Sequence, residues 1–147
     1  WFGTVGTWAK VGPHVKAALA YAKQHGATSV ALVGLCWGCR MSIEATKELA
    51  GDLIGAALLH PAMLTAEDIK GAKRPLCILP SKDEGDYTAI ETALSENEFK
   101  DQNKYKQFSD MHHGWCGARA DFTSELNRTR THEALEIVTD FFNAIFA

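Results

Sequence analysis

A cysteine with a glycine two positions away on each side is the first feature of the sequence that suggests chemistry. The stretch Gly34-Leu35-Cys36-Trp37-Gly38 directly follows a short apolar run. The pattern Gly-x-nucleophile-x-Gly is typical of a sharp turn from a strand into a helix, where small residues let the two elements pass each other. Such a turn exposes the thiol near a helix N-terminus, which favours the thiolate. It also directs the backbone N–H of Trp37 toward a developing oxyanion, so Cys36 is a candidate nucleophile.

A nucleophilic cysteine needs a general base within hydrogen-bond reach and an acid that orients this base. Two neighbouring histidines, His112 and His113, follow the last expected strand, and either could serve as the base. Three acids, Asp83, Glu84 and Asp86, follow the strand before it. We interpret Glu84 and Asp86 as solvated or helix-capping residues. Nucleophile, acid and base then occur in the chain order of the α/β-hydrolase architecture.

Short apolar runs alternate with amphipathic segments along the chain, which predicts strands alternating with helices. We expect strands at residues 29–34, 55–59, 76–79 and 104–108. We expect helices at residues 13–25, 37–50, 65–70, 87–97 and 124–146, with Pro13 in the first turn of the first helix and Leu135, Val138, Phe142 and Ile145 on one face of the last. The alternation predicts an α/β fold with a mostly parallel sheet and flanking helices. Active sites of such sheets lie beyond the carboxyl ends of the strands, where the candidate residues occur.

Composition and charge indicate an ordinary globular protein. The 147 residues are 46% hydrophobic and 22% charged, with a net charge of −3. Without a basic stripe, nucleic-acid binding is not expected, and no apolar run reaches the roughly 20 residues that span a bilayer. Four cysteines are too few for a disulfide framework, which indicates the reducing cytoplasm. We therefore expect a cytoplasmic protein with neither a nucleic-acid nor a membrane partner.

Four segments together resemble successive landmarks of the dienelactone hydrolase family. They span nearly the whole chain and comprise Gly34–Gly38, His60-Pro61, Leu79–Glu84 and His112–Trp115. The resemblance implies an α/β-hydrolase that cleaves a lactone or small ester through a thioester on Cys36, with Asp83 as the orienting acid and His113 as the base. His113 is preferred over its neighbour because a glycine and an aromatic residue follow it, as in the family. We expect no cofactor and no metal.

Two features depart from the family pattern. Cys39 stands where the family usually has a second glycine, and the first strands of the expected domain are missing from a chain that begins at Trp1. We therefore expect residues 1–147 to form a single, partial domain. A missing N-terminal segment or self-association would cover the sheet edge that this leaves exposed.

Three further residues are candidates for substrate binding. A guanidinium pairs bidentately with a carboxylate, so Arg40 and Arg119 are candidates to hold a charged substrate. Trp115 is a candidate to line the pocket, although aromatic residues at such places are as often core. His60 lies at a strand end near the expected site, where a structural hydrogen bond is the simpler interpretation.

Other interpretations stay open. Cys36 and Cys39 also form a C-x-x-C, the spacing of thiol–disulfide oxidoreductases, and a disulfide between them could switch a hydrolase off. Cys36, Cys39, Cys116 and one histidine could bind zinc, although the second ligand pair lacks the usual spacing. A hydrolase-like binding domain without activity is a further alternative.

Overall fold

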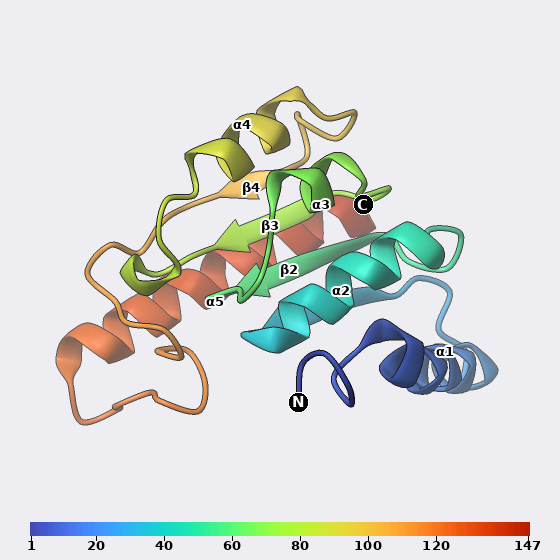
Figure 1. The fold of residues 1–147 in the computed structure, drawn as a ribbon, viewed down its shortest axis with the longest axis horizontal. Coiled ribbons are helices and arrows are strands. Elements are labelled where there is room, and N and C mark those ends of the chain that lie inside the picture. The colour runs from blue at the N-terminus through green and yellow to red at the C-terminus, as the bar shows by residue number, and fades with distance from the viewer.

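A four-stranded parallel sheet runs through the centre of the computed structural model, which describes residues 1–147 (Figure 1). Its strands lie in chain order and are β1 (Ala31–Leu35), β2 (Gly55–Leu59), β3 (Leu76–Leu79) and β4 (Lys104–Tyr105). The helical elements are α1 (Trp8–Gln24), α2 (Trp37–Glu48), α3 (Ala66–Lys70), the 3-10 turn η1 (Lys82–Glu84), α4 (Thr88–Glu96) and α5 (Glu125–Phe146). This arrangement confirms the expected α/β fold with a parallel sheet.

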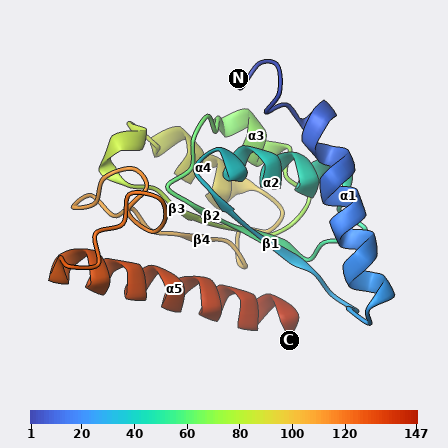
Figure 2. The same cartoon turned by 90° about the horizontal axis from the view of Figure 1, so that it is seen from below.

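Helices cover both faces of the sheet, and each face has its own apolar core. Figure 2 shows α5 on one side and α2, α3 and α4 on the other, with α1 beside α2. Along β2, Ala56 and Leu58 pack toward α2 and α3, whereas Ala57 and Leu59 pack toward α5. Every β2 residue is buried. Because alternate side chains of a strand point to opposite faces, a strand buried on both faces must be apolar throughout, as this one is.

The first helix begins earlier than the sequence predicts. α1 starts at Trp8, so Pro13 lies inside the helix rather than in its first turn. The side chain of Trp8 packs against the small core of Leu19, Leu49 and their neighbours between α1 and α2. This burial extends the helix past the point that local helix signals indicate, because tertiary packing outweighs a weak local preference.

Most of the face expected to be buried on the last helix contacts the core. Val138 is buried, and Phe142 and Ile145 are partly buried against the same apolar core as Ala134 and Phe141, whereas Leu135 is 53% exposed. The expected face is therefore correct at Val138, Phe142 and Ile145 and wrong at Leu135. β4 is also shorter than expected, because the chain leaves the ladder after Tyr105 and returns only in an isolated bridge between Phe108 and Ser81.

β1 forms an edge of the sheet, since it pairs only with β2. Val33 and Leu35 on this strand are 52% and 39% exposed, although large apolar side chains are usually buried in a parallel sheet. Coverage of this edge by a further segment or by a second copy stays a prediction. No helix combines the length and the apolar character that crossing a membrane would need.

Candidate active site

Cys36 occupies the sharp turn between β1 and α2. Its backbone has φ 54° and ψ −121°, in the left-handed half of conformational space that side chains other than glycine rarely adopt. Its N–H donates to the Leu59 carbonyl at 3.2 Å, and its carbonyl accepts from the N–H of Ala62 at 3.1 Å. The end of β2 therefore holds the turn from both sides. This geometry is that of a nucleophile on a strained strand-to-helix turn.

Only one of the two glycines around Cys36 is required by close contact. A Cβ on Gly34 would lie 2.7 Å from the N of Cys39 and 2.7 Å from the carbonyl oxygen of Gly38. A Cβ on Gly38 would meet nothing within 4 Å. The expectation that both glycines keep strand and helix apart is therefore correct for Gly34 and wrong for Gly38.

The imidazole of His113 connects the thiol to a carboxylate. Its Nε2 lies 3.0 Å from Cys36 Sγ, and its Nδ1 lies 2.6 Å from Glu84 Oε1. The neighbouring His112 turns away, with its Nε2 3.1 Å from the backbone carbonyl of Arg119. The structure thus brings His113, and not His112, to the candidate nucleophile.

The carboxylate that contacts the ring is Glu84, which corrects the expectation for Asp83. Asp83 accepts a hydrogen bond from the backbone N–H of His113 at 2.9 Å, whereas the hydrogen-bond partners of the ring are Glu84 and Cys36. The Glu84 side chain is only 3% exposed, whereas Asp83 is an exposed residue. Asp83 therefore binds the backbone of the loop that carries His112 and His113 (the histidine loop), and Glu84 binds the ring of His113.

A local signal in the sequence marks Glu84. Ser81 and Glu84 form a capping box around η1, in which the Ser81 hydroxyl donates to Glu84 Oε1 at 2.9 Å and the Ser81 N–H donates to Oε2. The pattern Ser-x-x-Glu is the known signature of this motif. The interpretation of Glu84 as a capping residue is correct, and Oε1, which accepts from the Ser81 hydroxyl, is also the oxygen that contacts Nδ1 of His113.

The thiol of Cys39 is engaged by backbone carbonyls and forms no disulfide with Cys36. Its Sγ donates to the carbonyls of Gly34 at 3.1 Å and Leu59 at 3.4 Å, and the residue is fully buried. Burial raises the pKa of the Cys39 thiol well above its usual value, and the nearby Cys36 adds to this effect. All four cysteines are free, and no three His, Cys, Asp or Glu side chains are placed to hold a metal ion.

The guanidinium of Arg40 is engaged by carboxylates of the protein itself. It lies 2.5 Å from Asp68 and 2.7 Å from Glu44, and Lys47 binds the second oxygen of Asp68 at 2.9 Å. The Asp68 side chain is 7% exposed and also accepts hydrogen bonds from Thr65. This corrects the expectation that Arg40 offers a free guanidinium to a substrate carboxylate.

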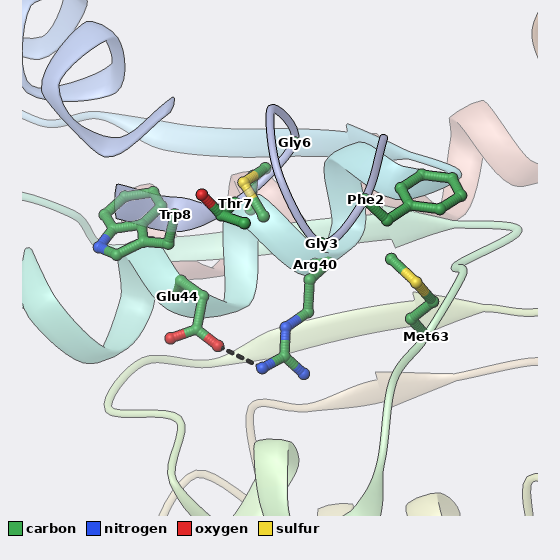
Figure 3. A pocket seen from close by; sticks show the side chains of 9 residues that line it. Phe2, Gly3, Gly6, Thr7, Trp8, Arg40, Glu44 and Met63 are labelled. Carbon is green, nitrogen blue, oxygen red and sulfur yellow. Dashed lines mark ion pairs between the residues drawn. The ribbon is translucent and has the colours of Figure 1, made fainter. Parts of the chain in front are cut away.

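A surface cavity of about 490 Å³ lies between the N-terminal segment and α2. Figure 3 shows the guanidinium of Arg40 between Glu44 and Met63, with Phe2 and Trp8 on the rim. Neither Cys36 nor His113 lines this cavity. It is therefore separate from the thiol and the imidazole.

The remaining predicted site residues lie in three different environments. Trp115 is fully buried and packs on Phe108, with ring centroids 4.5 Å apart, so it is a core residue and not part of a pocket lining. Arg119 is exposed and forms no ion pair, and its stem packs beside Gly114 in the loop that follows His113. Trp37 is the first residue of α2, so its N–H has no partner within the helix.

A cysteine on a strained strand-to-helix turn, an imidazole and a carboxylate at the carboxyl edge of a parallel sheet define an α/β-hydrolase-like domain. The comparison with known families agrees with this class. The chain belongs to the dienelactone hydrolase family, whose family model matches residues 4–146.

Its relatives include two AIM2 family proteins of Schizosaccharomyces pombe that are named as uncharacterized. One is 32% identical over 94% of this chain and 55% of its own length, and the other is 31% identical over 77% of this chain and 46% of its own length. An endo-1,3;1,4-beta-D-glucanase of Zea mays is 36% identical over 51% of this chain and 24% of its own length. The chain thus spans about half the length of the two AIM2 family proteins.

The two glycines of the turn give a matched test of its packing. We expect Gly34→Ala to lower the free energy of unfolding by about 1–3 kcal/mol, because its Cβ would collide with backbone atoms that cannot move aside. We expect Gly38→Ala to raise it by about 0.5–1 kcal/mol, because alanine favours the helix and meets open space there. Urea unfolding measures both, and equal stability of the two variants would show that Gly34 is not required by close packing.

Asp68→Asn tests the ion-pair network behind the site. We expect a loss of about 1–3 kcal/mol near neutral pH, because Arg40 and Lys47, which are both partly exposed, would share one carboxylate instead of two. Glu67→Gln, which removes an exposed pair with Lys70, is the control and should cost under about 0.5 kcal/mol.

The loss of stability in Asp68→Asn should also depend on pH. Burial of Asp68 raises its pKa, but hydrogen bonds from Lys47 and Thr65 and the nearby charges outweigh this, so its pKa is lowered in the folded protein. A carboxyl with a lowered folded-state pKa stabilises the protein above its unfolded-state pKa and loses this contribution as the pH falls through the folded-state value. Urea unfolding over an acidic pH series should therefore show the wild type approaching Asp68→Asn, and a constant difference would refute the assignment.

Proposed function

We propose that this protein is a hydrolase that cleaves a lactone or a small ester through a thioester on Cys36. One observation carries the proposal: the His113 ring lies between Cys36 Sγ, at 3.0 Å, and the Glu84 carboxylate, at 2.6 Å. A carboxylate at Nδ1 keeps the proton on that nitrogen, so Nε2 is free to accept the proton of the thiol. Membership of the dienelactone hydrolase family supports the same chemistry.

In the proposed reaction, His113 takes the thiol proton and the sulfur of Cys36 attacks the carbonyl carbon. The N–H of Trp37 donates to the oxyanion, with the positive end of α2 behind it. The C–O bond to the leaving group then breaks, and His113 returns its proton to the departing oxygen. A water, deprotonated by His113, attacks the thioester and releases the acid and the thiol.

The same geometry supports different proposed tasks for the two acids. Glu84 stabilises the imidazolium at Nδ1 and holds the tautomer that the first step needs. Asp83 acts on the backbone of His113 and so positions the loop. The proposed triad is therefore Cys36, His113 and Glu84, with Asp83 in a supporting role.

We propose a substrate with a good leaving group, such as an enolate, because a thiolate expels poor leaving groups slowly. Arg119 is the proposed partner of a substrate carboxylate, since it is exposed, unpaired and in the loop that carries His113. Four free cysteines favour a reducing compartment, and we propose the cytoplasm.

The other candidate functions have less support. In a C-x-x-C redox protein the second thiol would face the first, whereas Cys39 Sγ donates to two backbone carbonyls. A binding domain without activity would not need an imidazole at hydrogen-bond distance from both a thiol and a buried carboxylate. Both alternatives make predictions that the same assay tests.

The assay is hydrolysis of a panel of small lactones and aryl esters by the wild type and Cys36→Ala. We expect turnover of at least one activated ester, with the rate in Cys36→Ala falling to that of the buffer. A Cys39→Ser variant should keep its activity with and without reductant. Turnover by Cys36→Ala equal to the wild type, or none by the wild type on any substrate, would refute the proposed function.

Glu84→Gln and Asp83→Asn form a matched pair that tests which acid acts on the ring. Each substitution removes one negative charge, and the two substituted residues are neighbours in η1. We expect kcat to fall on the order of 10²- to 10⁴-fold in Glu84→Gln, because the imidazolium loses its partner and the amide admits the wrong tautomer. Asp83→Asn should lose about 10-fold or less, because an amide oxygen still accepts the N–H of His113. The reverse order would return the triad role to Asp83.

A further inference from the structure

His60 is a buried imidazole beside the candidate site that the proposed reaction does not use. It directly follows β2 and is only 2% exposed. Neither of its ring nitrogens has a hydrogen-bond partner. Leaving a buried polar atom unsatisfied costs about 1–3 kcal/mol, so such a residue requires an explanation. The expected structural hydrogen bond from this side chain is therefore not formed to another group of the protein.

The ring of His60 packs directly on the ring of His113. The two centroids lie 5.0 Å apart and the planes meet at 73°, which is an edge-to-face contact. His113 has Cys36 at Nε2 and Glu84 at Nδ1. Those contacts hold the two ring nitrogens, and the edge-to-face contact with His60 is a third contact of the same ring.

Hydrogen bonds hold the backbone around His60 in place. Its N–H donates to the Leu79 carbonyl at 2.9 Å, and the following Pro61 carbonyl accepts from the Tyr87 hydroxyl at 3.1 Å. On the far side, Nε2 lies 3.6 Å from the position that a Cβ on Gly117 would take. The backbone of His60 is thus bound to the end of β3, and its ring lies next to Gly117 and the His113 ring.

The backbone conformation explains why histidine occupies this position. His60 has φ 38°, in the left-handed region. Asparagine, aspartate, histidine and glycine are the residues most often found there, and only histidine among them carries a ring. A phenylalanine would supply the ring but would strain the backbone, whereas an asparagine would relieve the backbone and lose the ring.

We propose that His60 is a positioning residue that holds the His113 ring between Cys36 and Glu84 through ring contact. This inference rests on the proposed function for its purpose, although its test does not need turnover. The ring of His60 stays uncharged near neutral pH, because burial lowers its pKa and the neighbouring His113 lowers it further. His112 acts in the same direction and Glu84 opposes it. An uncharged neighbour can support an imidazolium without repelling it.

The test is the rate at which iodoacetamide, an uncharged reagent, alkylates Cys36. Cys36 is the expected site, because Cys39 and Cys77 are buried and burial raises the pKa of Cys77 and of Cys116 to about 12. The readout is the ratio of the rate near pH 7 to the rate near pH 9. This ratio reports how well His113 supports the thiolate, and a change in overall stability alone would not move it.

We expect His60→Asn to lower this ratio at least about 10-fold, because His113 would no longer be held against Sγ. His60→Phe should restore the ratio to within about 3-fold of the wild type, at a lower melting temperature because of the strain at φ 38°. Met63→Asn is the matched control. Met63 has φ 59° in the same loop and is 48% exposed, so its variant should behave as the wild type.

An unchanged ratio in His60→Asn would overturn the inference, and so would a ratio in His60→Phe as low as in His60→Asn. The proposed function is judged separately by ester hydrolysis. If the wild type cleaves no ester but His60→Asn lowers the ratio, the hydrolase proposal fails and the positioning role stands. If hydrolysis depends on Cys36 but His60→Asn leaves the ratio unchanged, the hydrolase proposal stands and the positioning role fails.

Discussion

Hydrogen bonds that continue the parallel ladder past the strand ends hold the candidate site together. The N–H of Cys36 donates to Leu59, that of His60 to Leu79, and that of Phe108 to Pro80. Each of these three segments is therefore fixed to the end of a neighbouring strand before the chain turns away. Because all strands are parallel, these fixed points lie at one edge of the sheet. The thiol and the imidazole are 77 positions apart in the chain but meet there at 3.0 Å.

All non-glycine residues with a strained backbone conformation lie at this same edge of the sheet. Cys36, His60 and Met63 are the non-glycine residues with positive φ, and all three lie at or after the carboxyl ends of β1 and β2. Each costs on the order of 1–3 kcal/mol and persists only where the surroundings impose it. Here the buried β2 strand and its ladder impose it. The strain is therefore local to the site, while the two apolar cores below it remain regular.

Much of the fold and part of the site could be predicted from the sequence. Strands such as residues 55–59 are short apolar runs buried on both faces, which is a local and strong pattern. The candidate nucleophile could be predicted for a similar reason, because a glycine at position 34 is required by the close backbone contact between β1 and α2. The order of nucleophile, acid and base followed from the topology alone.

What the sequence did not predict depends on contacts between distant segments or on side-chain direction. Asp83 and Glu84 are adjacent, and only the geometry of η1 decides which carboxylate reaches the ring. Arg40 was expected to be free, but its partner Asp68 lies 28 positions away on α3. No spacing rule connects these two residues, so the pairing emerges only when α2 and α3 pack on the same face of the sheet.

The pairing of Arg40 affects the electrostatics of the thiol. Arg40 and Lys47 on α2 carry two positive charges, and Glu44 and Asp68 carry two negative charges within 3.3 Å of them. Paired charges largely cancel one another at a distance, so α2 offers little net side-chain charge to Cys36. The positive potential at the thiol must then come from the helix N-terminus and from His113 when it is protonated. A site built in this way depends on the orientation of one imidazole, which is why the packing around that ring matters as much as its two polar partners.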